Sequence, residues 1–174
     1  MKPLLIRAAA PADIPAITRI YAHAVAHGTA TFEIDAPDQA EMTQRRLALV
    51  DAGFPYIAAE LDGTLLGYAY AGHYRPRPAY RFTVEDSIYV DPEAHRRGVG
   101  RALLDRLISE STGLGFRQMV AVIGDSTQTS SIELHRAAGF RMIGTFESVG
   151  YKFGRWIDTV LMQRALGPGA ATQP

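Results

Sequence analysis

The stretch of residues 87–108 constrains the fold more than any other, because it predicts a strand, a tight loop and a helix in immediate succession. An apolar run at residues 87–90 indicates the strand, and Pro92 ends it, since proline cannot continue a ladder inside a sheet. Gly98 and Gly100 then allow the backbone to turn sharply. The helix is predicted by apolar residues at helical spacing, which are Leu103, Leu104, Leu107 and Ile108.

The same loop carries positive charge at the predicted start of the helix, from Arg96, Arg97 and Arg101. Unpaired N–H groups and the positive end of the helix dipole favour anions there, so the loop predicts a site for phosphate or pyrophosphate. A Walker loop would need Gly-Lys-Ser/Thr, and a dinucleotide fingerprint would need glycine where Leu103 stands. A plain strand-to-helix turn without a ligand is the alternative.

The composition predicts one globular domain without a global electrostatic attraction to any partner. With 174 residues, 47% hydrophobic and 21% charged, the chain is large enough for a real core. A formal net charge of +0 argues against nucleic-acid and membrane partners. The absence of cysteine excludes a thiolate metal site and a cysteine nucleophile, and it fits a cytoplasmic location.

The apolar pattern predicts mixed helices and strands in one domain at residues 1–166, followed by a disordered tail at residues 167–174. Strands are expected at residues 4–8, 54–60, 65–72, 82–90, 116–123, 140–145 and 156–164. Helices are expected from about residue 11 to 27, from 35 or 37 to about 52, from Gly100 to about 113 or 115, and at 132–138. Residues 146–155 are expected to form a glycine-spaced connection.

The predicted strand at residues 82–90 carries two unusual carboxylates, Glu85 and Asp86. Even positions of the strand are apolar except for Asp86, which suggests a β-bulge beside an active site. Glu85 is unusual because strands disfavour glutamate and burial disfavours charge. A solvent-facing carboxylate is the alternative for Glu85.

Arginines and prolines between residues 73 and 81 predict an irregular loop. Arg75 and Arg77 are suited to bind a carboxylate or phosphinate through paired hydrogen bonds, with Tyr74 and Tyr80 as walls. An exposed loop with solvated arginines is the alternative.

His23 and His27 are four residues apart on a predicted helix, but they lack a carboxylate motif, so we expect no metal site.

The glycine loop resembles the acetyl-CoA loop of the GCN5-related N-acetyltransferases, whose pattern is Gln/Arg-x-x-Gly-x-Gly/Ala. Here the segment reads His95-Arg96-Arg97-Gly98-Val99-Gly100, with His95 at the first position. A second resemblance lies in the segment Leu134-His135-Arg136-Ala137-Ala138-Gly139-Phe140, where the family often has Leu-Tyr-x-x-x-Gly-Phe. Gln128 stands where the family has asparagine. The resemblance implies the α/β fold of that family, a mostly antiparallel mixed sheet of about seven strands flanked by about four helices and splayed at its central strand pair.

Further segments are similar to the phosphinothricin and methionine sulfoximine or sulfone acetyltransferases. They are Thr83-Val84-Glu85, Ala121-Val122-Ile123-Gly124, Leu134-His135 and Gly150-Tyr151-Lys152-Phe153-Gly154-Arg155-Trp156-Ile157-Asp158. The resemblance implies acetyl transfer from acetyl-CoA to the α-amine of a small amino-acid-like substrate, without a metal. It also implies a homodimer.

The resemblance assigns catalysis to Glu85 and His135. It implies acetyl-CoA contacts from Ile88, Tyr89, Val90, Arg96, Arg97, Gly98, Val99, Gly100, Arg101 and Gln128. Substrate contacts are implied for Phe32, Tyr70, Arg75, Arg77 and Tyr80. Lys152 and Trp156 are singled out as lining the substrate pocket or a subunit interface, the alternative being a surface lysine and a core aromatic residue.

Several alternatives stay open at this point. His135 acts either with Glu85 as the base or as the acid for the departing sulfur, because an ordinary histidine titrates near neutral pH and an ordinary glutamate far below it. The amine substrate could instead be a protein N-terminus, a polyamine or an antibiotic, because a fold does not fix a substrate. A non-catalytic acyl-CoA sensor and a nucleotide-binding module are the alternatives outside this activity.

Overall fold

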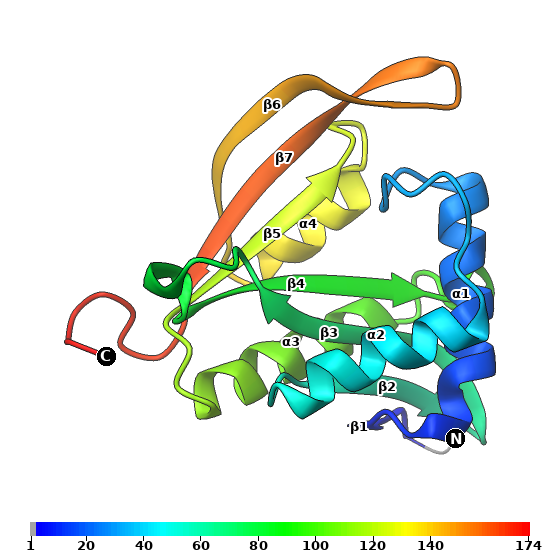
Figure 1. Cartoon of the computed structure of the whole chain (residues 1–174), viewed down its shortest axis with the longest axis horizontal. Helices are drawn as coiled ribbons and strands as arrows, with labels where there is room; N and C mark the ends of the chain where they lie inside the picture. The colour runs from blue at the N-terminus through cyan, green and yellow to red at the C-terminus, as the bar shows by residue number, and fades with distance from the viewer. Residues whose placement is uncertain (1–2) are drawn as a thin grey trace.

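The structure is a computed structural model that describes residues 3–174. A single seven-stranded sheet has the strand order β1-β2-β3-β4-β5-β7-β6, and of its neighbouring pairs only β4 and β5 are parallel. The strands are β1 (Leu5–Ala8), β2 (Tyr56–Leu61), β3 (Thr64–His73), β4 (Thr83–Val90), β5 (Gln118–Gly124), β6 (Arg141–Lys152) and β7 (Arg155–Ala165). The helices are α1 (Ile14–His27), α2 (Gln39–Asp51), α3 (Val99–Gly113) and α4 (Thr129–Ala137) (Figure 1). The predicted mixed sheet with four helices is confirmed.

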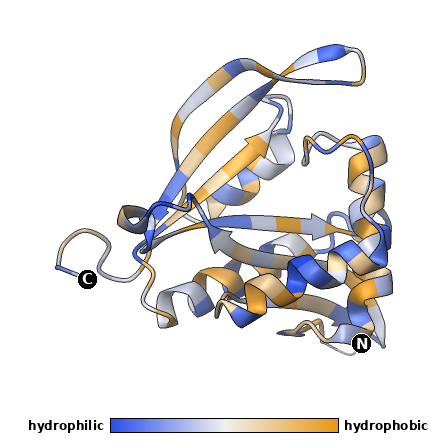
Figure 2. Cartoon of the chain, viewed as in Figure 1, coloured by the Kyte–Doolittle hydropathy of each residue, from blue (hydrophilic) through white to orange (hydrophobic). Residues whose placement is uncertain are grey.

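Helices cover both faces of the sheet. One cluster of buried side chains joins α1 to β2 and β3, and includes Ile17, Ile20 and Tyr68. The other joins α3 and α4 to the central strands, and includes Leu103 and Leu107. Hydrophobic and hydrophilic residues accordingly alternate along the strands and around the helices (Figure 2). Within residues 3–174, no helix is long and apolar enough to cross a membrane.

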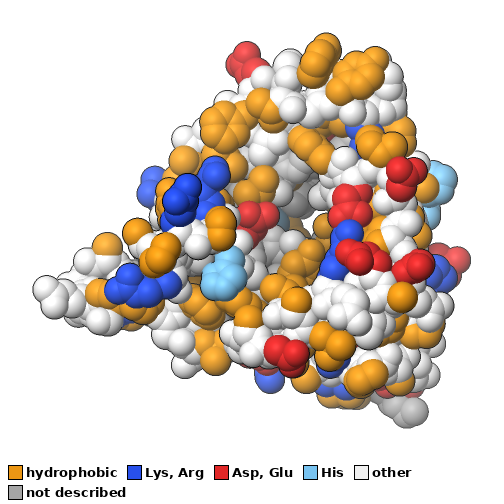
Figure 3. All heavy atoms as spheres, viewed as in Figure 1, with side chains coloured by type: hydrophobic (Ala, Val, Ile, Leu, Met, Phe, Trp, Pro, Cys, Tyr) orange, Lys and Arg blue, Asp and Glu red, His pale blue; other side chains and the backbone are white. Residues whose placement is uncertain are grey.

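The sheet opens between its two central strands. β4 and β5 pair only from Thr83 with Gln118 to Asp86 with Ala121. Beyond that point β4 stays with β3 as far as Val90, while β5 stays with β7 (Figure 1). The space-filling view of this face is hollowed where the two strands part (Figure 3). The predicted splay of the central strands is therefore confirmed, and it creates an opening inside the sheet.

The β-bulge expected near Asp86 is wrong. β3 and β4 keep one register from His73 opposite Val84 to Gly67 opposite Val90. Asp86 is buried on the same face as Val84, so the strand alternates regularly and simply carries a carboxylate into the core.

The glycine-spaced connection expected at residues 146–155 is also wrong, because those residues extend the last hairpin. β6 runs to Lys152 and β7 begins at Arg155. Two register irregularities, between Met142 and Gly144 and between Phe146 and Gly150, interrupt the periodicity that sequence reasoning depends on. The resulting hairpin projects beyond the rest of the sheet (Figure 1).

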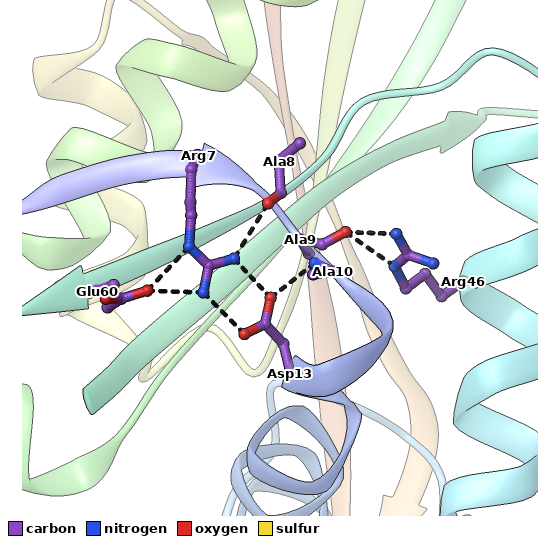
Figure 4. Close-up of polar contacts among 7 residues, drawn as sticks. All are labelled: Arg7, Ala8, Ala9, Ala10, Asp13, Arg46 and Glu60. Atoms are coloured by element: carbon purple, nitrogen blue, oxygen red, sulfur yellow. Dashed lines mark hydrogen bonds and ion pairs between the residues drawn. The ribbon is translucent and has the colours of Figure 1, made fainter. Parts of the chain in front are cut away.

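An arginine near the N-terminus joins β1 to β2 and to the start of α1 (Figure 4). Arg7 Nε and Nη2 donate to Glu60 Oε2 at 2.9 and 2.7 Å. Nη1 and Nη2 donate to the two carboxylate oxygens of Asp13 at 2.7 and 2.8 Å. Asp13 also accepts from the backbone N–H of Ala10 at 2.7 Å, so one guanidinium fixes the edge strand and the first helix together.

The C-terminal segment lies against Arg117, just before β5. This guanidinium donates to Gly169 O at 3.2 Å, to Thr172 Oγ1 at 3.0 Å and to Gln173 O at 2.9 Å. The disorder predicted for residues 167–174 stays a prediction.

Candidate active site

Glu85 points from β4 to the face of the sheet that α1 covers. Glu85 is paired with Gly72 of β3, and Ser87 is paired with Tyr70. Paired residues share a face of the sheet, and so do residues two apart on a strand, so Glu85, Ser87 and Tyr70 lie on one face. Its side chain is partly buried. Burial raises the pKa of Glu85 to about 7, the charge of Asp86 adds to the shift, and the charge of Arg75 opposes it. Glu85 is therefore a carboxylate with the proton affinity that a base needs near neutral pH.

Asp86 and His135 form a buried pair on the opposite face of β4. His135 Nε2 lies 2.9 Å from Asp86 Oδ2, and His135 Nδ1 lies 2.8 Å from Ser131 O. The whole residues are 4% and 7% exposed. Burial lowers the pKa of His135, but the hydrogen bond and charge of Asp86 outweigh it, so the net pKa is raised.

The two predicted catalytic residues thus lie on opposite sides of β4. Glu85 belongs to the strand itself, and His135 reaches the other side of the strand from α4. Glu85 and Asp86 are consecutive, so their side chains point in opposite directions. Both ring nitrogens of His135 are engaged by protein atoms, one by Ser131 O and one by Asp86. The structure therefore brings His135 to Asp86, on the side of β4 opposite to Glu85.

The open part of β4 offers backbone groups to a ligand. The Asp91 N–H donates to Leu66 O on β3 at 2.8 Å. Because backbone groups alternate in direction along a strand, the N–H groups of Ile88 and Val90 point away from β3 and toward the opening. The side chain of Tyr89 faces α1 instead, with its ring edge-on to that of Tyr21.

The glycine loop has the predicted geometry. Asp91 accepts from the Glu93 N–H at 3.0 Å, and α3 begins at Val99. Gly98 is the N-cap residue, with φ +79 and no side chain to cap the helix. The first N–H groups of α3 are therefore available to an anion, beside the exposed side chains of Arg96 and Arg97.

Two of the predicted acetyl-CoA contacts are engaged within the protein. Arg101 pairs with Asp105 at 2.7 Å and donates to Ala137 O at 3.1 Å. Gln128 Nε2 donates to Thr29 Oγ1 at 3.2 Å.

The arginine loop lies next to Glu85. The charges of Arg75 and Glu85 act on each other's pKa, and the Arg75 guanidinium lies 5.2 Å from the centre of the Tyr74 ring. The rings of Tyr74 and Tyr80 meet edge to face at 5.6 Å. Arg75 and Arg77 are both exposed. The structure thus brings Arg75 and the two tyrosines together, and the anion site predicted for this loop stays a prediction.

The remaining predicted substrate residues come from other segments. Tyr70 is partly buried on β3, burial raises its pKa, and the charges of Arg45, Glu85 and Glu33 act on it. Phe32 is 39% exposed in the loop after α1, which lies at the open end of the sheet (Figure 1). Lys152 is buried and Trp156 is 64% exposed, so the alternative of a surface lysine and a core aromatic residue is wrong for both.

Sequence reasoning missed Asp86 as the partner of His135. The sequence does single out Asp86, because it is the one polar residue on the apolar face of β4. That irregularity was interpreted as a β-bulge and not as a buried polar contact. Within residues 3–174, no group of three or more His, Asp or Glu side chains could hold a metal ion.

Comparisons with known proteins agree with this geometry. The family model for the "Acetyltransferase (GNAT) domain" matches residues 6–161. The chain is 59% identical to a phosphinothricin N-acetyltransferase of Alcaligenes faecalis over 162 residues, 93% of this chain and 82% of that protein. It is 42% identical to an L-methionine sulfoximine/L-methionine sulfone acetyltransferase of Salmonella typhimurium, over 97% of this chain and 98% of that one.

A solved structure extends the agreement to three dimensions. It is a phosphinothricin acetyltransferase of the GNAT superfamily from Sinorhizobium meliloti in complex with acetyl-CoA. The TM-score is 0.96 at 49% identity, and the match covers 98% of this chain and 92% of that one. This chain belongs to the GNAT family of acetyltransferases.

Proposed function

We propose that the chain transfers an acetyl group from acetyl-CoA to the α-amine of a small amino-acid-like acceptor, of the phosphinothricin, methionine sulfoximine or methionine sulfone type. The observation that carries this proposal is Glu85, a partly buried carboxylate with a pKa near 7 on β4, just before that strand parts from β5. The names of the relatives support the donor and the acceptor class.

Acetyl-CoA fits the opening between β4 and β5. Its pyrophosphate would contact the first N–H groups of α3, after Gly98, with Arg96 and Arg97 adding charge. Its extended arm carries amide groups, which suit the free backbone groups of Ile88 and Val90. This arrangement directs the thioester toward the strand that carries Glu85.

Glu85 acts as the general base. An α-amine is mostly protonated at neutral pH and must lose a proton before its nitrogen can attack. The neutral nitrogen then bonds to the thioester carbon, the carbon–sulfur bond breaks, and the sulfur leaves with the electron pair. The new amide nitrogen gives up a second proton and the sulfur takes up one, so the reaction releases one proton in total. Negative charge that builds on the carbonyl oxygen is stabilised by a backbone N–H of Ile88 or Val90.

His135 supports the reaction from the core. Its contact with Asp86 holds the strand residue that follows Glu85, and the charge of Asp86 is one cause of the raised pKa of Glu85. His135 is therefore a positioning residue in this proposal, and Glu85 the group that meets the substrate.

Arg75 and Arg77 hold the acceptor's acidic groups, with Phe32, Tyr70 and Tyr80 around it. Replacing either arginine by alanine should raise the KM of the acceptor, because paired hydrogen bonds to a carboxylate or phosphinate are lost. The KM of acetyl-CoA should stay unchanged. If neither replacement alters the acceptor's KM, this assignment fails.

The function is tested by CoA release from acetyl-CoA with phosphinothricin, methionine sulfoximine, methionine sulfone and a polyamine in parallel. We expect turnover with at least one of the first three and little with the polyamine, which has no acidic group for the arginine loop. Turnover with the polyamine alone would refute the acceptor class but not the acetyl transfer. Absence of turnover with all four would refute the proposal.

We further propose a cytoplasmic homodimer. β6 is an edge strand of the sheet, and exposed edges usually need a cover. Large apolar side chains are exposed along this hairpin, at Met142, Ile143, Phe146, Val149, Tyr151, Phe153 and Trp156. Such a patch fits a second copy of the chain. The cytoplasmic location rests on the supply of acetyl-CoA inside the cell.

A further inference from the structure

Phe32 lies between two glycines that come from different strands. A Cβ atom placed on Gly150 of β6 would lie 2.4 Å from Phe32 Cε2. A Cβ atom placed on Gly124, at the end of β5, would lie 2.8 Å from Phe32 Cε1 and 2.0 Å from Thr29 O. Real Cβ atoms do not approach other atoms this closely, so both positions have to be glycine while the ring stays where it is.

The backbone on the N-terminal side of Phe32 is held by a buried lysine. Lys152 is 4% exposed, and its Nζ donates to Gly28 O and to Thr31 O, both at 2.9 Å. Its neighbours Tyr151 and Phe153 are 60% and 56% exposed, so Lys152 is the inward-facing residue at the end of β6. Lysine is rarely buried, and here two carbonyl oxygens offset the loss of water around the amine.

The same loop is tied to both sides of the opening. Tyr21 and Thr31 share a hydrogen bond of 2.9 Å between their hydroxyl groups, and the Tyr21 ring packs edge-on against Tyr89 of β4 at 4.9 Å. On the other side, Thr29 accepts from Gln128 of the β5–α4 loop at 3.2 Å. The loop at residues 28–32 therefore crosses the mouth of the splay, and Phe32 is its partly exposed aromatic side chain.

We propose that Gly150 and Lys152 are positioning residues that fix Phe32 as one wall of the acceptor site, and that they thereby set which acceptor side chains are accepted. Gly150 leaves the space that the ring fills, and Lys152 holds the two carbonyl groups on the N-terminal side of the ring. The inference rests on the proposed function, because it assigns Phe32 to the acceptor side of the same site.

The first test compares Gly150→Ala with Gly144→Ala. Both glycines lie in β6, but a Cβ atom on Gly144 would have nothing within 4 Å. Gly150→Ala should raise the acceptor's KM about tenfold or more, the usual effect of losing one good apolar contact in a pocket. The KM of acetyl-CoA should stay unchanged, and Gly144→Ala should alter neither. Equal effects of the two variants would overturn the proposal.

A double-mutant cycle shows whether Gly150 acts through Phe32. Phe32→Ala should raise the acceptor's KM by itself, and Gly150→Ala should add nothing further once the ring is gone. The double variant also removes the clash between the new methyl group and the ring, so it should fold even if Gly150→Ala alone does not. Effects that multiply in the double variant would overturn the proposal.

Lys152→Met, which keeps the length of the side chain but not its N–H donors, should likewise raise the KM of the acceptor and not that of acetyl-CoA.

A second readout does not depend on activity. The chain has two lysines, Lys2 and Lys152, so reductive methylation at Lys152 can be followed by peptide mapping against free lysine as a standard. Lys152 should react slowly in the wild type, faster in Gly150→Ala and at the wild-type rate in Gly144→Ala. An unchanged rate in Gly150→Ala would overturn the proposed positioning. If the wild type used no acceptor of the panel, the proposed function would fail, while this labelling would still decide whether Gly150 holds the loop.

Discussion

Replacing His135 by alanine is expected to destabilise the folded chain by about 3–5 kcal/mol, because the partner charge stays behind in the core. His135 Nε2 lies 2.9 Å from Asp86 Oδ2, and the two side chains are 5% and 2% exposed. The other carboxylate oxygen, Asp86 Oδ1, has no hydrogen-bond partner among the described residues. Loss of the imidazole would therefore leave the Asp86 carboxylate without compensation in a place that water does not reach.

This destabilisation is large enough to measure directly. For a chain of this size each kcal/mol lowers Tm by about 2–4 °C, so His135→Ala should melt about 6–20 °C below the wild type. Urea unfolding gives the free energy, and His23→Ala serves as the control, because His23 is exposed on α1. In a cycle with Asp86→Asn, the double variant should be less destabilised than the sum of the two single variants.

The pair should also leave a pH signature. The net pKa of His135 is raised in the folded state, so the pair's contribution is complete below the unfolded pKa of about 6.5 and is lost as the pH rises through the folded value. The stability difference between the wild type and the non-titrating double variant Asp86→Asn/His135→Gln should therefore shrink as the pH rises above about 6.5 and through the raised pKa of His135. A His135→Ala protein of wild-type stability that has lost all activity would refute this reasoning and restore a direct catalytic role.

Three other outcomes are expected. Gly98→Ala should raise the KM of acetyl-CoA in steady-state kinetics with little change in that of the acceptor, because φ +79 costs any residue with a Cβ atom about 1–2 kcal/mol; an unchanged KM would contradict the loop assignment. Arg7→Met should lower the free energy of unfolding in urea at pH 7, since the paired carboxylate of Asp13 stabilises the fold fully above its unfolded pKa of about 3.8; the deficit should narrow as the pH falls below that value and through the lowered folded pKa. Trp156→Ser should weaken self-association in sedimentation equilibrium while the monomer keeps its Tm, and a wild-type monomer at high concentration would count against the dimer.

The regular parts of the fold followed from periodicity and turn chemistry. The glycine loop before α3 and the succession of seven strands along the chain were predictable, because each depends on neighbouring residues alone. The long β6–β7 hairpin was not predictable in the same way. Its register shifts near Gly144 and Gly150 break the alternation by which a strand is recognised.

The site was predictable in its residue types but not in its contacts. The resemblance singled out Glu85 and His135, yet the contact of His135 with Asp86 joins residues 49 positions apart in the sequence. The burial that raises the pKa of Glu85 likewise depends on tertiary packing, as does the contact of Gly150 with Phe32. These contacts form only after the sheet is assembled, and no local pattern encodes them.

In the proposed reaction Glu85 is the base for acetyl transfer, with a pKa near 7. The most direct measurement is kcat/KM for the acceptor as a function of pH, for the wild type and for Glu85→Gln. The acceptor amine titrates in both proteins, so the limb that belongs to Glu85 is the one that the variant loses. We expect a wild-type limb centred at about pH 7, and in Glu85→Gln its disappearance together with a loss of about 10²–10⁴-fold in rate. A Glu85→Gln variant that keeps the wild-type rate and pH profile would show that Glu85 is not the base.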